Sequence, residues 1–159
     1  MGLSLSVPKG VTVPPSLVAI YKEIERDLRN SNGTLQFTVP KHGDLTEWAK
    51  QGVLMLNNIL TVREGKSGSH SAFGWKTFTE RAIRKISQES RGVVFLLWGN
   101  EAQSLSSFID KSKHYVLCAG HPSPLNTKIP FSGCSHFSKC NELLTKHDKS
   151  PIDWNKINN

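Results

Sequence analysis

Three polar residues, Asn57, Asn100 and His121, each follow a short apolar run that is typical of a buried parallel strand. The three runs cover 53–56, 93–98 and 115–118. Ligands of an open α/β sheet bind at the edge where the carboxyl ends of parallel strands meet. The three side chains are therefore predicted to converge on one pocket. An asparagine amide there offers a donor beside an acceptor, which suits the hydrogen-bonding edge of a pyrimidine base.

Each of these residues also has an ordinary structural explanation. A single histidine is more often part of the packing than of a reaction, and an asparagine after a strand commonly forms a turn. His121, however, begins the stretch His-Pro-Ser-Pro-Leu, in which two prolines stiffen the loop after a strand. The combination is more informative than either residue alone.

The elements that would hold these residues follow from the spacing of apolar side chains. Helical spacing predicts helices over 16–30, 75–86, 102–109 and 137–146. Ser16 is expected to cap the first helix, and Asp44 with Glu47 forms a capping-box pattern for a short helix through Lys50. Strands that alternate with helices predict a three-layer α/β fold with a short, mainly parallel sheet, in one domain that covers 1–159.

Composition limits the class of protein. Lys and Arg number 20 against 13 Asp and Glu, and the net charge of +7 favours a polyanionic partner. The three cysteines are odd in number and form no CxxC pair, so a reducing intracellular compartment is expected. No apolar run is long enough to span a membrane, and the start lacks the pattern of a secretory signal. We expect a monomer, in the nucleus or mitochondrion of a eukaryote or in the cytoplasm of a bacterium.

Several motifs, in a fixed order along nearly the whole chain, resemble the uracil-DNA glycosylases of the main uracil-excising family. The matching stretches are GDL at 43–45, WAKQGVL at 48–54, LN at 56–57, LTVR at 60–63, FLLWG at 95–99, HPSPL at 121–125, GC at 133–134, HFSK at 136–139, NELL at 141–144 and PIDW at 151–154.

The resemblance implies a role for each matched position. Asn57 would hydrogen-bond the uracil edge, and His121 would donate to the carbonyl oxygen that gains charge as the base leaves. Leu5 stands where the family has a phenylalanine that stacks on the base. The implied DNA contacts are Pro14, Pro15, Ser16, Asn100 (which replaces a serine), Ser123, and Leu125 as the wedge that enters the duplex.

The resemblance also exposes two departures. The family's motif with the water-activating aspartate, and with the tyrosine that excludes thymine, would precede Gly2, so we expect an N-terminally truncated domain with impaired catalysis. The inner strand that carries this motif would be missing too. Its loss would leave the runs 53–56 and 93–98 apart with unpaired backbone groups, and three outcomes are open: the two runs pair directly, the segment 3–7 fills the gap, or the chain is unstable alone. We expect a marginal fold in which 93–98 and 115–118 remain neighbours.

The leading interpretation is a uracil-DNA glycosylase that hydrolyses the N-glycosidic bond of uracil in single- or double-stranded DNA to start base-excision repair. The alternative is a catalytically inactive DNA- or partner-binding remnant of that family. A basic α/β protein unrelated to DNA would require the ordered motifs to be accidental. The spacing of Cys134, His136, Cys140 and His147 allows zinc chelation, but it matches no common finger and a helix is expected across it, so no metal and no cofactor are predicted.

Overall fold

The computed structural model describes residues 2–32, 37–126 and 128–157. Its elements, in chain order, are α1 (Pro15–Asn32), α2 (Thr46–Lys50), α3 (Trp75–Glu89), β1 (Val94–Trp98), α4 (Asn100–Gln103), the 3-10 helix η1 (Ser104–Phe108), β2 (Tyr115–Ala119) and α5 (His136–Lys146). No described helix is both long and apolar enough to cross a membrane.

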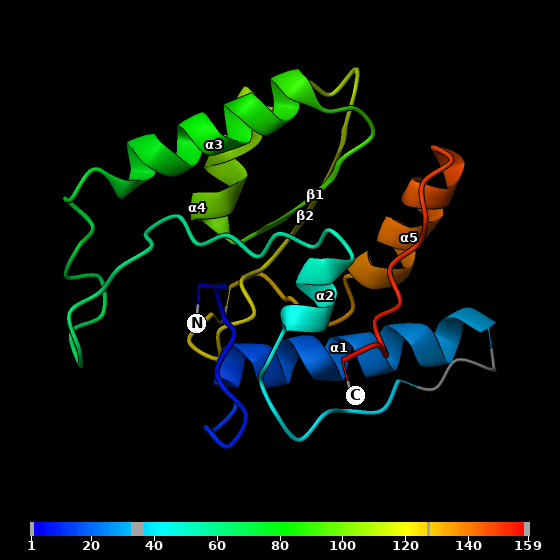
Figure 1. The fold of residues 1–159 in the computed structure, drawn as a ribbon, viewed down its shortest axis with the longest axis horizontal. Helices are drawn as coiled ribbons and strands as arrows, with labels where there is room; N and C mark the ends of the chain where they lie inside the picture. The colour runs from blue at the N-terminus through cyan, green and yellow to red at the C-terminus, as the bar shows by residue number, and fades with distance from the viewer. Residues whose placement is uncertain (1, 33–36, 127, 158–159) are drawn as a thin grey trace.

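Two parallel strands form the sheet. β1 pairs with β2 in a register that runs from Val94 opposite Tyr115 to Trp98 opposite Ala119. Figure 1 shows α3 on one side of these strands and α1 on the other, with α5 beside them. The predicted α/β class and the predicted pairing of the runs 93–98 and 115–118 are both confirmed.

The predicted strand over 53–56 is not formed. Residues 53–57 belong to no helix or strand, and Leu54, Met55 and Leu56 take part in no backbone hydrogen bond to a described residue. A strand is defined by its pairing partner, and the far edge of β1 is separated from this segment by a cavity. The apolar run has the composition of a strand but has no described neighbour with which to pair.

Two predicted helix caps are wrong. α1 begins at Pro15, so Ser16 lies inside the first turn and not at the cap, and proline suits the first helical position because its missing N–H would have no partner there. The capping box of α2 is absent because both acids bond elsewhere. Asp44 Oδ1 accepts the N–H and hydroxyl of Thr46 at 3.0 and 2.6 Å, and Glu47 accepts from Lys50 at 2.6 Å. The helix expected over 102–109 is divided between α4 and η1.

Buried apolar side chains gather in two clusters. The larger joins α1, α2, α5 and the C-terminal segment, and Trp48 lies within it, where its indole N–H donates to the carbonyl of Trp154 at 3.0 Å. The smaller joins α3 to β1 through Ile83, Phe95 and Leu97. The sheet therefore lies at the boundary between two cores.

Two buried carboxylates of α1 tie this helix to the segment that leads into α5. Glu23 is 2 % exposed and accepts the backbone N–H groups of Gly133 at 2.8 Å and Ser135 at 3.0 Å. One turn later, Asp27 accepts the backbone N–H and the hydroxyl of Ser138 at 2.8 and 2.6 Å. Negative charge is thus placed against the first turn of α5, where free N–H groups favour it.

Candidate functional site

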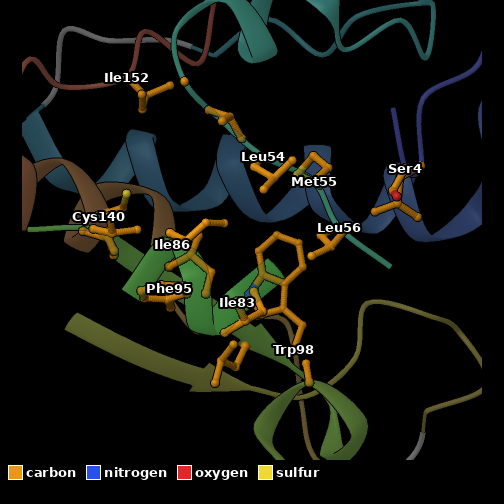
Figure 2. Close-up of a pocket in the computed structure, with 18 of the residues that line it drawn as sticks. Ser4, Leu54, Met55, Leu56, Ile83, Ile86, Phe95, Trp98, Cys140 and Ile152 are labelled. Carbon is orange, nitrogen blue, oxygen red and sulfur yellow. The ribbon is translucent and has the colours of Figure 1, made fainter. Parts of the chain in front are cut away.

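A cavity of about 690 Å³ lies between residues 51–58 and β1. Three of the predicted site residues, Leu5, Asn57 and His121, are among the residues that line it. Trp98, at the end of β1, lines the same region, and Figure 2 shows its indole close to Leu56. Asn57 and His121 therefore line the same cavity, and His121 follows the carboxyl end of β2.

His121 is held in one ring orientation and one tautomer by its own loop. The backbone N–H of Ser123 donates to His121 Nδ1 at 2.9 Å. Burial lowers the pKa of His121 below its ordinary value, so the ring is neutral at pH 7. Because Nδ1 accepts a hydrogen bond, the single ring proton resides on Nε2, which is left as a donor.

The turn after β1 must be glycine for the histidine to fit. Gly99 has φ +87°, and a Cβ at this position would lie 3.1 Å from His121 Cβ. Its N–H donates to the carbonyl of Ala119 at 2.9 Å, which continues the pairing of the two strands up to the site. A left-handed conformation and a close approach therefore both require a residue without a side chain.

The side chains of Asn57 and its neighbour Asn58 differ in how they are held. The Asn57 backbone N–H donates to Ser4 Oγ at 3.2 Å, and its amide makes no hydrogen bond to a described residue. Asn58, by contrast, accepts from Thr79 Oγ1 at its main-chain and side-chain oxygens, at 3.1 and 3.0 Å. α3 thereby anchors Asn58 and leaves the amide of Asn57 available to a ligand.

The loop after His121 carries Leu125 outward. Leu125 is 90 % exposed, and its N–H donates to Ser123 Oγ at 3.2 Å. Asn126 Nδ2 donates to the carbonyls of His121 at 3.1 Å and Ile129 at 2.6 Å and so closes the base of the loop. Ser123 therefore links the histidine ring to the exposed leucine.

The remaining predicted site residues lie in different structural environments. Leu5 is half-buried with φ +63°, a strained value for a side chain of this size, and it packs against the larger core. The other candidates do not line the cavity: Pro14, Pro15, Ser16, Asn100, Ser123 and Leu125. Pro14 lies beside Gly43, where a Cβ would approach its ring to 3.7 Å, and Asn100 is the first residue of α4.

Two groups that hold the His121 loop were not identified from the sequence. Asn126 was identifiable only as a turn-forming residue after a Pro-rich motif, and nothing in the sequence indicated that its amide would bridge two carbonyls. The backbone N–H of Ser123 was not recognisable at all, because main-chain donors leave no mark on residue types.

The zinc alternative gains no support. Within the described ranges no group of three or more His, Cys, Asp or Glu side chains is arranged to hold a metal ion. Burial raises the pKa of the Cys134 and Cys140 thiols to about 11, so both remain protonated near neutral pH.

The cavity lining contains no carboxylate among the described residues. Among the described lining residues the only formal charge is that of Lys149, which lies near Gly92, before the start of β1. The site as described can donate hydrogen bonds, but among its described lining residues it offers no acid or base well placed to activate a nucleophile other than His121.

Comparisons with known proteins agree on one family. A sequence model of the uracil DNA glycosylase superfamily matches residues 10–145. The chain is 55 % identical over 155 residues to a protein of Campylobacter lari named uracil-DNA glycosylase, and 53 % identical over 153 residues to one of Vibrio parahaemolyticus with the same name. These matches cover 98 % and 96 % of this chain but only 64 % and 65 % of the relatives.

Solved structures give the same result. The crystal structure of mimivirus uracil-DNA glycosylase has a TM-score of 0.82 and 33 % identity, over 97 % of this chain and 59 % of that chain. A variant of mimivirus UNG in complex with UGI has a TM-score of 0.83 at 33 % identity, over 97 % of this chain and 60 % of that chain. The chain thus spans just under two thirds of the length of these proteins.

Proposed function

The chain belongs to the uracil DNA glycosylase superfamily, and from that premise we propose that its site binds a uracil flipped out of DNA and promotes cleavage of the bond to its sugar. The observation that supports the proposal is that Leu5, Asn57 and His121 all line one cavity. Leu5 supplies apolar contact to the base without the aromatic face that the family resemblance leads one to expect.

Asn57 would determine which base is accepted. Uracil has a carbonyl beside an N–H, whereas cytosine has an amine beside an unprotonated nitrogen. An asparagine amide that pairs with both groups of uracil would make two mismatched contacts with cytosine. A buried polar group without a partner costs about 1–3 kcal/mol, which corresponds to roughly 5- to 150-fold discrimination.

His121 would lower the barrier to bond cleavage. As the glycosidic bond breaks, the sugar gains positive charge and the base gains negative charge. The neutral imidazole, with Nδ1 occupied by the Ser123 N–H, directs Nε2–H as a donor for the uracil oxygen that becomes negative. Donors of this kind each contribute about 10²–10³-fold in rate.

We propose that excision by the 159-residue chain is slow, because no carboxylate lines the described cavity to orient a water molecule. Single-turnover excision from an oligonucleotide with one uracil should therefore be far slower than excision by the Campylobacter lari relative. A comparable rate in this chain would contradict the proposal of impaired catalysis. It would leave the proposed binding of uracil intact.

Recognition of the base can be tested without catalysis. We expect free uracil, and not cytosine, to shift the NMR signals of the Asn57 side-chain amide and the His121 ring. Asn57→Ala should abolish the difference between the two bases. Gln88→Ala, at an exposed position of α3 outside the cavity, is the matched control and should preserve it. Equal responses to uracil and cytosine in the unmodified chain would refute the assignment.

An alternative is a catalytically inactive DNA- or partner-binding remnant of the family, and the absence of a carboxylate from the described lining of the cavity favours it. Leu125, exposed at the loop tip, would enter the duplex, while Ser16, Asn100 and Ser123 would contact phosphates of single- or double-stranded DNA inside the cell. Binding by a monomeric chain with a net charge of +7 should weaken steeply from 50 to 200 mM salt. Fluorescence anisotropy measures this, and an affinity independent of salt would exclude the phosphate contacts.

A further inference from the structure

The loop that leads into α3, residues 61–74, carries an aromatic side chain that the described fold leaves open to solvent. Phe73 is 67 % exposed, and Phe78, in the first turn of α3, is 55 % exposed. The other described phenylalanines are buried or half-buried. Figure 1 shows the loop projecting beyond the start of α3. Exposed aromatic rings so close together are more than the scattered apolar side chains of an ordinary surface, and they indicate a binding surface.

Hydrogen bonds within the loop hold it in one shape. The Thr61 hydroxyl accepts from Trp75 Nε1 at 2.6 Å and lies 2.9 Å from His70 Nδ1, so it ties the start of the loop to its end. The N–H of Phe73 donates to the carbonyl of His70 at 3.1 Å, which closes a turn between the two rings. A ring that is presented by a closed loop loses little conformational freedom when a ligand binds to it.

His70 and Phe73 form a stacked pair that is open on one side. Their ring centroids lie 4.3 Å apart, and their planes are 12° from parallel. Because His70 covers one face of Phe73, the opposite face is the one left to solvent. A planar base on that face would extend the stack from two rings to three. Every nucleobase has a π face, so such stacking tolerates any base.

The charge around the stacked pair favours a nucleic acid over an apolar partner. Residues 60–78 contain three cationic side chains and one acidic side chain, namely Arg63, Lys66, Lys76 and Glu64. Proteins that bind single strands combine such cations, which attract the phosphates, with aromatic rings on which the bases stack. Both components are present in this loop and the first turn of α3.

The loop is also attached to the candidate site. Lys76 Nζ and Asn58 Nδ2 both contact Glu101 Oε2, each at 3.1 Å, and Glu101 lies in α4 directly after Asn100. The chain from Asn57 to Thr61 spans at most about 14 Å, since a residue extends by no more than about 3.6 Å. A DNA strand with its uracil at Asn57 therefore has the loop within reach of a nearby nucleotide.

We propose that the outer face of Phe73, backed by His70, stacks an unpaired base of the DNA strand whose uracil occupies the cavity. The base belongs to a single strand, because the bases of a duplex are already stacked and paired, and freeing one costs energy. The inference rests on the proposed function in taking DNA as the ligand. It adds a second contact to a base, at a nucleotide other than the uracil, and this contact carries no preference for sequence.

Two DNA strands separate base stacking from attraction to phosphates. A fluorescent oligothymidylate of about 12 nucleotides falls within the range of about 4–16 nucleotides that single-strand-binding domains cover. An abasic strand of the same length keeps the phosphates and lacks the bases. In fluorescence anisotropy, Phe73→Ala should weaken binding of the oligothymidylate roughly 5- to 150-fold, the effect of losing one stacked base. It should leave binding of the abasic strand, and of a duplex without uracil, unchanged.

Other substitutions at the same position distinguish stacking from general apolar contact. Phe73→Leu keeps an apolar side chain but removes the flat ring, so it should weaken binding of the oligothymidylate nearly as much as Phe73→Ala. Phe73→Trp keeps a flat ring and should bind at least as tightly as the unmodified chain. Val39→Ala is the matched control, at an apolar residue that is 42 % exposed and lies outside both the loop and the cavity lining, and should leave binding unchanged.

Four results would overturn the proposal. They are the absence of oligothymidylate binding, a Phe73→Leu chain that binds as tightly as the unmodified chain, an equal loss of affinity for both strands in Phe73→Ala, and self-association that Phe73→Ala abolishes. The last would assign the exposed ring to a second copy of the chain. None of these strands contains uracil, and the response of Asn57 to free uracil is measured separately, so failure of this proposal is distinguishable from failure of the proposed function.

Discussion

Replacement of Glu23 by glutamine changes one oxygen of a buried carboxylate to an amide, at the junction between α1 and the segment before α5. In the folded chain, Oε2 accepts from Gly133 N–H at 2.8 Å and Arg26 Nε at 2.9 Å, and Oε1 accepts from Arg26 Nη2 at 2.7 Å and Ser135 N–H at 3.0 Å. Glutamine keeps one acceptor. Its NH₂ group must then face two donors.

The size of the effect follows from these contacts. Each hydrogen bond to a charged group contributes about 1.5–3 kcal/mol, and two are lost. Arg26 is 37 % exposed in its side chain and recovers part of its hydration, so we expect a net loss of roughly 3 kcal/mol. For a chain of this length that corresponds to a fall of roughly 6–12 °C in the unfolding temperature.

The dependence on pH provides a second readout. Burial raises the pKa of Glu23, but hydrogen bonds from Arg26, Gly133 and Ser135 outweigh burial and hold the pKa below the ordinary 4.5. A carboxyl with a lowered pKa stabilises the fold above its unfolded value, and this contribution is lost as the pH falls through the folded value. The difference between Glu23 and Glu23→Gln should therefore be largest near pH 7 and shrink below about pH 4.5.

Urea and thermal unfolding of both proteins at pH 7 and pH 4 would measure these differences. Glu25→Gln is the matched control, because Glu25 lies on the same helix and pairs with Arg29 only at the surface, at 3.2 Å. It should change stability by less than about 0.5 kcal/mol. A Glu23→Gln protein as stable as the Glu25→Gln protein would refute the account of this junction.

Three further predictions concern the site. Gly120→Ala would place a Cβ 1.8 Å from the carbonyl oxygen of Ile129, so we expect a large fall in unfolding temperature, whereas Gly2→Ala, with no atom within 4 Å, should be neutral in the same scan. His121 should titrate below its ordinary pKa of 6.5, with Nε2 protonated in the neutral form; long-range ¹H–¹⁵N NMR spectra would show this, and a midpoint at or above 6.5 would contradict it. Asn126→Ala removes both bonds that close the loop after His121. Hydrogen exchange of the backbone amides in that loop should accelerate. An unchanged exchange rate would mean that the Asn126 side chain does not hold the loop closed.

The sequence was most informative where structure is determined locally. The spacing of Trp75, Ile83 and Ile86 predicted α3, and the apolar run 93–98 predicted β1, since both patterns reflect which side of one element is buried. The run 53–56 looks the same as 93–98, yet it forms no strand. Whether an extended segment pairs depends on a neighbour elsewhere in the chain, which composition does not reveal.

The site was predictable in part for the same reason. Asn57 and His121 were proposed as site residues because each follows an apolar run, and both line the same cavity although only the run before His121 forms a strand. The caps at Ser16 and Asp44 were mispredicted because short polar side chains have several competing partners close by. The tautomer of His121 rests on the N–H of Ser123, and a main-chain donor is present at every residue but proline.

The division of the apolar interior into two clusters has a consequence for how the chain opens. Trp98 and Ala119 contribute to the larger cluster, while Phe95 and Leu97, in the same strand as Trp98, belong to the smaller one. The five-residue pairing of β1 with β2 is thus shared by both cores. The smaller cluster buries few side chains and borders the cavity beside β1. We therefore expect α3 with η1 to open at a lower free energy than is needed to separate α1 from α5. In such a partly open state Thr79 leaves Asn58, so the segment that presents Asn57 to a ligand would lose its anchor while most of the fold persists.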